Sequence, residues 1–282
     1  AGVHSGDSIS VYPTQNVEKE NEKEIIEYTE KIAKELNVIG ILNIQFIISE
    51  GKVYIIEVNP RSSRTVPYIS KVTNLPMIEI ATNVILGQKL KDMPYGTGLY
   101  KKSDYICVKM PVFSFEKIKN ADTSLGPEMK STGEVLGVSK KYHEAVLKAF
   151  IASGANVSTS GNILITVRDK DKPEMLTVAK KFDKIGFKIY ATKGTASYLK
   201  ENGIDAIVVE KIWEGKDSIL DFVINTPTKG KQSGRDGFKI RRMAVECKIP
   251  CFTSLDTVNA LYKAIEKETK ETDLDVVDIT KV

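Results

Sequence analysis

The sequence is poor in several features that would point to a particular class of protein. Its 282 residues include only three cysteines, Cys107, Cys247 and Cys251, and their spacing is not that of a metal site. This low number predicts a reducing compartment without a disulfide framework. No apolar run approaches the roughly 20 residues that a membrane-spanning helix needs, and no charged and then apolar leader opens the chain. We therefore expect a cytoplasmic protein with no membrane partner.

The charge of the chain is nearly balanced, with 41 lysines and arginines against 37 aspartates and glutamates. The net charge of +4 lacks the basic excess of a dedicated nucleic-acid binder, so we expect no nucleic-acid partner. The hydrophobic share of 41% is enough for real cores and argues against a mostly disordered chain. At roughly 150 residues per domain, the length predicts two domains. The chain opens at Ala1 without a methionine, and we expect it to be part of a longer polypeptide.

The first half of the chain contains a predicted helix and a predicted β-hairpin. Apolar residues recur at helical spacing over residues 17–36, with glutamates and lysines on the opposite face. Two apolar runs, 41–48 and 53–59, then flank the residues Glu50 to Lys52. The glycine in that short connection favours a tight turn between two antiparallel strands.

The hairpin carries the first group of side chains that suggests chemistry. Side chains two positions apart on a strand share a face, so Glu57 and Asn59 project together. If the loop consists of Glu50 to Lys52, the pairing sets Gln45 opposite Glu57 and Asn43 opposite Asn59. Oxygen ligands of this kind suit Mg²⁺, which takes one or two carboxylates together with substrate phosphates.

Two arginines follow this patch directly. Arg61 and Arg64 are suited to neutralising phosphate oxygens. The alternative is that this face of the hairpin is simply solvated and that Arg61 pairs with Glu57, since polar alternation is ordinary in antiparallel sheets. Spacing alone does not separate the two interpretations.

Gln45 and the run Glu57-Val58-Asn59-Pro60-Arg61, with Arg64 three residues on, resemble the metal-binding end of the ATP-grasp fold. The resemblance implies that Gln45, Glu57 and Asn59 hold Mg²⁺ or Mn²⁺ ions that bridge the phosphates of ATP. It also implies catalytic roles for Arg61 and Arg64.

The opening segment of the chain is similar to the strand edge with which ATP-grasp proteins contact adenine and ribose. The resemblance implies a cofactor-binding set of Gly2, Val3, His4, Ser5, Gln45 and Glu57. The glycine-rich loop that clamps ATP in that family is missing upstream, so the resemblance covers only the carboxyl-terminal part of the fold. Half of a phosphate cradle positions ATP poorly, and we expect this chain to be inactive by itself.

A longer run, Gly126-Pro127-Glu128-Met129-Lys130-Ser131-Thr132-Gly133-Glu134-Val135, resembles a segment of the carbamoyl-phosphate synthase large subunit. Physical reasoning alone predicts a loop over 120–135 and a helical or mixed segment over 134–147. At Met110 some family members have an acid that binds an amino-acid activator, so we expect no activation of that kind.

The order of the two parts narrows the resemblance further. In that family the large subunit contains two ATP-grasp halves, and an ATP-grasp part followed by an α/β domain resembles the second half. The resemblance implies that carbamate and ATP give carbamoyl phosphate and ADP, a step of arginine and pyrimidine biosynthesis. It also implies two partners, the remainder of the large subunit and a glutaminase small subunit.

The small, polar stretch from Ser153 to Gly161 predicts a domain boundary. We expect residues 1–154 to be the carboxyl-terminal part of an ATP-grasp domain with a following helical segment, and 155–282 to be a second domain. Its short apolar runs predict strands over 163–167, 187–191, 206–209, 221–225 and 251–253, alternating with helices. This pattern predicts a parallel sheet covered on both faces. The predicted fold class is α/β, an α+β ATP-grasp remnant followed by a Rossmann-like parallel-sheet domain.

Polar side chains follow the predicted strands of this second domain. Ligands bind outside the carboxyl ends of parallel strands. Hydroxyls, amides and lysines gather there with almost no acidic side chains. This composition predicts an anion site, and phosphate is the anion that it favours. Any single threonine here is more typical of a helix N-cap, but five strand ends with the same charge bias favour a site. The candidate residues are Thr166, Lys172, Thr192, Lys193, Thr195, Lys211, Asn225, Thr226, Thr228, Thr253 and Ser254.

The second domain is similar to the methylglyoxal-synthase-like domain. In carbamoyl-phosphate synthases this domain is the regulatory one. The resemblance therefore implies an allosteric role, in which the domain binds UMP or IMP through the phosphate. No histidine lies beyond His143, so the acid–base groups for catalysis are missing and we expect binding only. Two alternatives remain, a stand-alone phosphate-binding regulatory module and another ATP-grasp ligase fused to such a domain.

Overall fold

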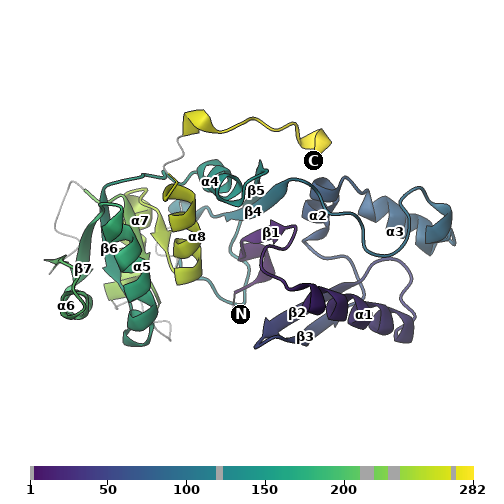
Figure 1. Ribbon diagram of the computed structural model, residues 1–282, viewed down its shortest axis with the longest axis horizontal. Helices are drawn as coiled ribbons and strands as arrows, with labels where there is room; N and C mark the ends of the chain where they lie inside the picture. Colours follow the sequence, from purple (N-terminus) through teal and green to yellow (C-terminus); the bar gives the residue numbers. More distant parts are fainter. Residues whose placement is uncertain (1–2, 119–122, 210–218, 228–235, 268–270) are drawn as a thin grey trace. The chain divides into compact units, whose positions relative to one another are not determined.

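The structure is a computed structural model of the chain, and it describes residues 3–118, 123–209, 219–227, 236–267 and 271–282 (Figure 1). The chain folds as two compact units. One unit comprises residues 1–10 and 108–275, and the other comprises 11–107 and 276–282. This division reflects packing and does not define domains, so the domain boundary expected between residues 154 and 155 stays a prediction.

The unit of residues 11–107 is built around a helix and a hairpin. Helix α1 (Lys19–Glu35) packs on strands β2 (Asn43–Ser49) and β3 (Lys52–Asn59), which pair with each other. The amide of Asn21 in α1 donates a hydrogen bond of 2.9 Å to the carbonyl of Gly51 in the turn. The helix and the two strands predicted for this region are confirmed.

Helices α2 (Val66–Thr73) and α3 (Met77–Ile85) follow the hairpin and had no counterpart among the predictions. Pro67 stands at the beginning of α2, where a missing N–H costs nothing. Asn74 ends the helix in a left-handed conformation at φ 52°. The short 3-10 helix η2 (Leu90–Asp92) comes next.

The other unit begins with the 3-10 helix η1 (Ser5–Asp7). Strands β1 (Ser10–Tyr12), β4 (Ile106–Val112) and β5 (Gly133–Ser139) form a three-stranded sheet in the order β1-β4-β5. The opening segment was expected to be a strand edge, and that is wrong for residues 5–7, because they form a tight turn and the strand begins only at Ser10.

Strand β5 and helix α4 decide between the two alternatives predicted for residues 134–147, a helical or a mixed segment. The segment is mixed, since β5 runs to Ser139 and helix α4 begins at Tyr142 and ends at Ala152. Gly137 allows the helix to lie directly on the strand. A Cβ atom at this glycine would lie 2.1 Å from the carbonyl oxygen of Ala145 and 2.6 Å from the backbone nitrogen of Ala149. Between β4 and β5 lies the 3-10 helix η3 (Phe115–Lys117).

The second half of the chain forms a parallel sheet of five strands, in the order β10-β9-β6-β7-β8. All five predicted strands and the parallel arrangement are confirmed, and the chain has the α/β class. The strands are β6 (Asn162–Thr166), β7 (Lys188–Thr192), β8 (Ala206–Val209), β9 (Phe222–Asn225) and β10 (Cys251–Phe252). The helices are α5 (Lys172–Lys184), α6 (Lys193–Glu201), α7 (Asp236–Glu246) and α8 (Leu255–Ile265), with 3-10 helices η4 (Asp169–Asp171), η5 (Glu271–Asp273) and η6 (Ile279–Lys281).

Both faces of this sheet are covered, as a parallel sheet requires. Leu164 and Val223 pack on Ile240 and Ala244 of α7. The neighbouring residue Phe222 belongs to a cluster of aromatic rings that includes residues of α5 and α8. Since neighbouring side chains on a strand point to opposite faces, α7 lies on one side of the sheet and α5 and α8 lie on the other.

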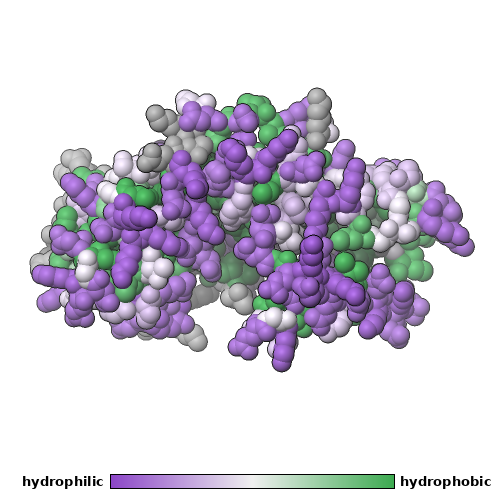
Figure 2. Space-filling model, viewed as in Figure 1, coloured by the Kyte–Doolittle hydropathy of each residue, from purple (hydrophilic) through white to green (hydrophobic). Residues whose placement is uncertain are grey.

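The surface is largely hydrophilic on the face shown in Figure 2, with hydrophobic area in the region of α3. There, Ile85 and Leu86 are 63% and 79% exposed. In the part of the chain that the structure describes, no helix combines the length and the apolar character that crossing a membrane would require.

Candidate functional site

The β2–β3 hairpin brings together the polar side chains that the sequence singled out. Gln45 pairs with Glu57 and Asn43 pairs with Asn59, so both predicted pairs are confirmed. The predicted loop is wrong by one residue. Its turn consists of Glu50 and Gly51, with φ angles of 51° and 73°, and Lys52 already pairs with Ser49.

Side-chain contacts link the polar residues at the end of β3. The Asn59 amide nitrogen donates a hydrogen bond of 2.9 Å to the Glu57 carboxylate, which confirms that the two side chains share a face. Arg61 donates from Nη2 to the Asn59 amide oxygen at 3.4 Å and from Nη1 to the Ser62 carbonyl at 3.0 Å. Among the described residues, Arg61 makes these bonds and no ion pair with Glu57, but Glu57 is exposed, as the alternative of a solvated face expects.

The chemistry of this donor set fits a hard divalent cation. Gln45, Glu57 and Asn59 offer oxygen ligands with a single carboxylate, which suits Mg²⁺ when phosphates and waters supply the rest. Within the described ranges, no cluster of three or more His, Cys, Asp or Glu residues occurs. The amide of Asn59 would have to turn to present its oxygen beside Glu57, because its nitrogen now donates to that carboxylate.

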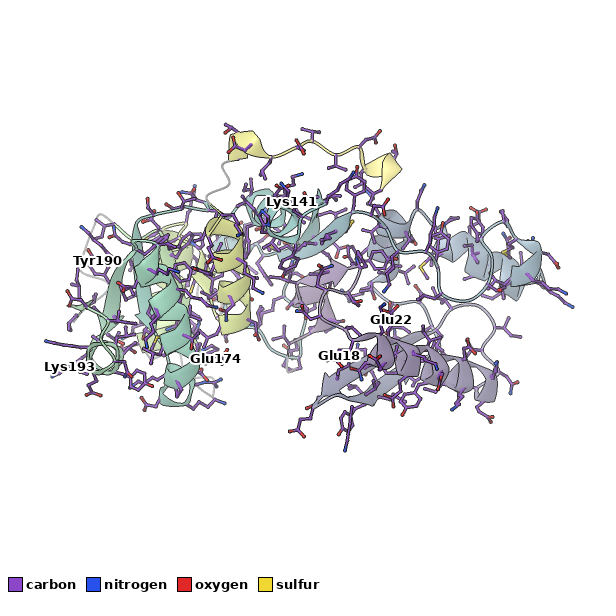
Figure 3. All side chains as sticks on the ribbon, viewed as in Figure 1. Glu18, Glu22, Lys141, Glu174, Tyr190 and Lys193 are labelled. Atoms are coloured by element: carbon purple, nitrogen blue, oxygen red, sulfur yellow. The ribbon has the colours of Figure 1, made fainter. Side chains whose placement is uncertain are left out.

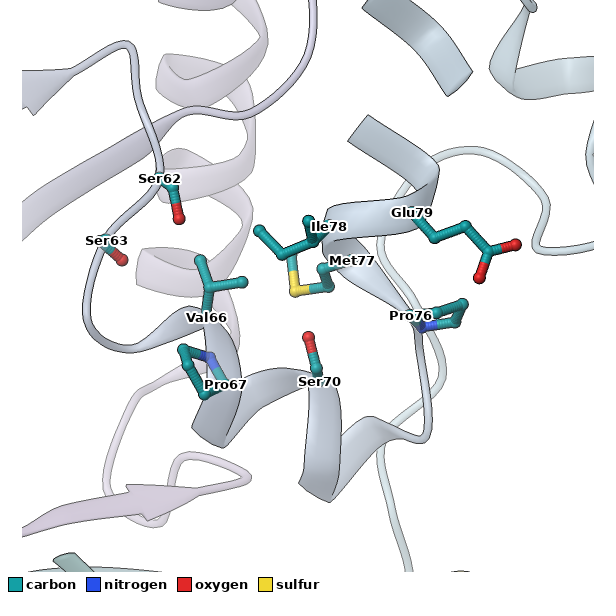
Figure 4. A pocket seen from close by; sticks show the side chains of 9 residues that line it. All are labelled: Ser62, Ser63, Val66, Pro67, Ser70, Pro76, Met77, Ile78 and Glu79. Carbon is teal, nitrogen blue, oxygen red and sulfur yellow. The ribbon is translucent and has the colours of Figure 1, made fainter. Parts of the chain in front are cut away.

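A pocket of about 400 Å³ lies in the same unit (Figure 4). Its first lining residue, Ser62, directly follows Arg61 in the sequence. Ser62 and Ser63 line it from the loop after β3, and the remaining side chains come from α2 and the beginning of α3. Figure 4 shows serine hydroxyls beside apolar side chains, so the pocket offers a few polar groups on a largely apolar wall. Its lining residues are Ser62, Ser63, Val66, Pro67, Ser70, Pro76, Met77, Ile78 and Glu79.

The opening segment packs against the run of residues 126–131, and each of these two segments contributes to the family resemblance of the sequence. The backbone N–H of His4 donates to the Gly126 carbonyl at 2.9 Å. A Cβ atom at Gly6 would lie 2.7 Å from the sulfur of Met129, so the contact is close. His4 Nδ1 accepts a hydrogen bond from the Gly6 N–H at 3.0 Å, which leaves Nε2 as the other ring nitrogen that can make a contact.

Of the predicted nucleotide contacts in this segment, Val3 and Ser5 are exposed and His4 is half-buried. Gly2 lies outside the described residues. The structure therefore leaves Val3 and Ser5 accessible to a ligand, and it fixes the ring of His4 through its bond with Gly6.

Asp7 holds the two segments together through a buried carboxylate. Its Oδ2 accepts from the N–H of Lys130 and its Oδ1 accepts from the N–H of Ser131, both at 2.9 Å. Burial by itself would raise the pKa of Asp7. The hydrogen bonds from Ser131 and Lys130 outweigh that effect and hold the pKa below its ordinary value of 3.8.

The candidate anion site lies at the carboxyl ends of β6, β7 and β9. The order of the strands reverses direction at β6. From β6 the chain continues to β7 and β8 on one side of the sheet, whereas β9 and β10 lie on the other side. Thr166 pairs in register with Asn225 across this point. The Thr192 hydroxyl donates to the Thr166 hydroxyl at 3.1 Å, which joins the second strand to the group. Such a turning point is where open α/β sheets bind ligands.

Lys172, the first residue of α5, links the segment after β6 with the beginning of α6. Its Nζ atom donates to the Gly194 carbonyl at 3.0 Å and lies 2.8 Å from the Asp169 carboxylate. Lys193, labelled in Figure 3, is exposed at the beginning of α6. Thr195 is 2% exposed, so its hydroxyl does not face open solvent.

The remaining predicted residues divide into three groups. Thr192 and Ser254 precede helices α6 and α8, but neither makes the side-chain hydrogen bond of an N-cap, so the simple capping interpretation does not explain them. Thr253 follows β10, the edge strand beside β9. Lys211 and Thr228 lie outside the described residues.

Sequence reasoning missed three charged residues at this site. Arg241 of α7 is buried and donates from Nη1 to the Asn225 amide oxygen at 2.6 Å. Arg168 and Asp171 form an ion pair in the loop after β6. Asp171 also corrects the expectation of a site with almost no acids. Burial would raise its pKa, but hydrogen bonds from Arg168 and Thr226 hold the pKa below its ordinary value.

Family models match two parts of the chain. Residues 1–93 match the model of the carbamoyl-phosphate synthase L chain, ATP binding domain, and residues 174–253 match that of the MGS-like domain. The chain thus combines sequence of an ATP-binding domain with an MGS-like domain. Together with the relatives described next, these matches place the chain in the carbamoyl phosphate synthase large-chain family.

Three relatives carry that assignment. Carbamoyl phosphate synthase large chains of Lachnoclostridium phytofermentans, Agathobacter rectalis and Clostridium botulinum (strain Loch Maree) are 52%, 49% and 52% identical to this chain. The similarity covers 100%, 99% and 99% of this chain, which spans 27% of the length of each relative. Among solved structures, methylglyoxal synthase of Elizabethkingia anophelis NUHP1 aligns with 42% of this chain and 83% of its own at 16% identity, with a TM-score of 0.31, too low to support an argument.

Proposed function

We propose that this chain is part of an enzyme that phosphorylates carbamate with ATP to give carbamoyl phosphate and ADP. The observation that carries the proposal is the pairing of Gln45 with Glu57 and of Asn43 with Asn59 at one end of the β2–β3 hairpin. Four oxygen-bearing side chains meet there, and Arg61 lies within hydrogen-bond distance of Asn59. Similarity to carbamoyl phosphate synthase large chains supports the choice of substrate.

In this proposal, Gln45, Glu57 and Asn59 hold Mg²⁺ or Mn²⁺ and thereby orient the phosphates of ATP. The cation, when bound, neutralises the charge that develops during phosphoryl transfer. Arg61 and Arg64 stabilise phosphate oxygens, for which a guanidinium has the right geometry. Gly2, Val3, His4 and Ser5 contact the nucleoside.

The chain by itself is proposed to be inactive. Only Gly2, Gly6 and Gly40 precede Gln45, so this sequence contains no glycine-rich loop to cover the phosphates. Phosphoryl transfer depends on positioning from both sides, and one side alone contributes little. The remainder of the large subunit and a glutaminase small subunit are the proposed partners in a cytoplasmic complex that serves arginine and pyrimidine biosynthesis.

The sheet of β6 to β10 is proposed to bind the phosphate of a nucleoside monophosphate such as UMP or IMP and to regulate the enzyme. Thr166 and Asn225 meet at the turning point of the strand order, and Lys172, the first residue of α5, donates to the Gly194 carbonyl in α6. These groups offer one hydroxyl, one amide and one ammonium donor to an anion.

Titration calorimetry with UMP and IMP, together with an assay of carbamate-dependent ADP release, tests these proposals on the 282-residue chain. Binding of a nucleoside monophosphate with no ATP turnover supports both. Robust ADP release by this chain alone would contradict the proposed inactivity. Absence of binding to either nucleotide would contradict the proposed effector site and would leave the ATP site to be tested by mutation in the complete enzyme.

A further inference from the structure

Thr226 cannot serve the anion site in the way that its position suggests. Its hydroxyl oxygen accepts a hydrogen bond from the backbone N–H of Arg168 at 3.1 Å. A side-chain hydrogen bond from Thr226 helps to lower the pKa of Asp171, and because the ionised carboxylate can only accept, the Thr226 hydroxyl is the donor in this bond. A hydroxyl has one proton to donate, so Thr226 cannot donate to a phosphate without releasing Asp171.

The residue that these contacts position is Arg168. Its backbone is tied to Thr226 after β9, and its side-chain Nε donates to Asp171 Oδ2 at 2.5 Å. The side chain is 29% exposed. Within the described part of the chain, the guanidinium contacts Asp171 through Nε. The N–H groups on Nη1 and Nη2 are therefore the ones that it can offer to a ligand.

The place of Arg168 in the chain agrees with an anion ligand. Arg168 follows Thr166 by two residues, and Thr166 and Asn225 mark the turning point of the strand order. Lys172 stands four residues further on, with its charge partly balanced by Asp169. A planar guanidinium held by a carboxylate on one edge presents its other edge for paired hydrogen bonds to phosphate oxygens.

We propose that Arg168 is a further ligand of the phosphate bound at this sheet, and that Thr226 is a positioning residue that acts through Arg168 and Asp171. The inference rests on the proposed effector site and adds to it a specific donor. Thr226 then contributes to affinity only as long as Arg168 is present.

The test uses the complete 282-residue chain, titrated calorimetrically with inorganic phosphate and with UMP. Arg168→Met is expected to weaken binding about tenfold or more, and Arg168→Lys to give an intermediate loss, because an ammonium keeps the charge without the paired geometry. Lys170→Met is the matched control, since it removes a positive charge from the same loop at an exposed position, and it should change affinity less than about threefold.

A double-mutant cycle separates a ligand from a positioning residue. Thr226→Val should weaken binding several-fold (about three- to tenfold) in the wild-type background, and Thr226→Ser should restore it. In the Arg168→Met background, Thr226→Val should have no further effect. An equal loss in both backgrounds would show that Thr226 contacts the anion itself and would overturn the inference.

Two outcomes distinguish this inference from the proposal beneath it. If the wild-type chain binds neither phosphate nor UMP, the effector site itself is wrong. If the wild-type chain binds UMP and Arg168→Met binds equally well, with both chains unfolding at the same temperature, only the role of Arg168 is wrong.

Discussion

Gln45 and Glu57 are partners across the β2–β3 hairpin because Ile56 is an extra residue in β3. The register runs from Ser49–Lys52 to Phe46–Ile55 and then shifts to Gln45–Glu57. Without this bulge, Gln45 would pair with Ile56. The Glu57 side chain would then point to the opposite face of the hairpin from Gln45. The bulge therefore aligns the carboxylate with the amides of Gln45, Asn43 and Asn59.

The first prediction tests the carboxylate at this position. Glu57→Gln in the complete large chain should lower carbamate-dependent ADP formation by at least about 100-fold, because an amide replaces the one charged oxygen ligand of the proposed cation site. Steady-state assays at increasing Mg²⁺ or Mn²⁺ measure the effect. UMP binding should be unchanged. Glu27→Gln, at an exposed position of α1, is the matched control and should keep full activity.

Activity of Glu57→Gln close to that of wild type would contradict the assignment of Glu57 as a metal ligand. Partial recovery at high Mn²⁺ would support it, because excess cation compensates a weakened site by mass action.

The pairing of Gln45 with Glu57 could be predicted, but by two errors that cancel. The sequence Glu50-Gly51-Lys52 suggested a three-residue loop, whereas the turn uses two residues with positive φ. The bulge at Ile56 restores the register that the shorter turn would have shifted. A run such as Tyr54-Ile55-Ile56 contains no local signal for a bulge, since every residue in it suits a strand.

The five strands of the parallel sheet were predictable because each is a short apolar run between polar turns. The contacts within its candidate site were not. Thr226 follows a strand and is predicted to be an anion ligand, and in the structure its side chain also forms a hydrogen bond with Asp171, a residue 55 positions earlier in the sequence. Hydrogen bonds between loops that are far apart in the sequence depend on the tertiary fold, and the residue types alone do not predict them.

The second prediction concerns Asp7. Asp7→Asn keeps one acceptor oxygen but presents an NH₂ group where the second backbone N–H now donates. We expect a loss of about 1–3 kcal/mol in the free energy of unfolding at neutral pH, measured by urea denaturation. Asp104→Asn, at an exposed position, should change stability by less than about 0.5 kcal/mol.

The pH dependence of this difference follows from the lowered pKa of Asp7. A carboxyl group with a lower pKa in the folded state stabilises the protein fully above its unfolded value, here the ordinary 3.8. The contribution is lost as the pH falls below that value through the folded pKa. The difference between wild type and Asp7→Asn should therefore stay constant from about pH 7 to about pH 5 and shrink below about pH 4. A difference that grows on acidification would contradict the assignment.

The third prediction concerns the contact between β5 and α4. Gly137→Ala places a Cβ atom 2.1 Å from the carbonyl oxygen of Ala145, and backbone on a packed helix cannot move aside without cost. We expect destabilisation of about 1–3 kcal/mol, measured by urea denaturation. Gly133→Ala on the same strand is the matched control, since nothing lies within 4 Å of its added Cβ atom. Equal stability of the two variants would show that α4 does not pack on β5 as closely as described.

The last prediction concerns Lys172, which joins the loop after β6 to the beginning of α6 through the Gly194 carbonyl. Lys172→Met should weaken the binding of inorganic phosphate and UMP about tenfold at low ionic strength, because an ammonium beside an anion contributes a charged hydrogen bond. Added salt screens this attraction, so the ratio between wild type and variant should fall as ionic strength rises. Lys184→Met, at the exposed far end of the same helix, controls for the loss of net charge and should bind as wild type does. If Lys172→Met and Lys184→Met had equal affinity for UMP, Lys172 would serve only to connect the two loops, and the anion would have to be held by the other donors at the ends of β6 and β9.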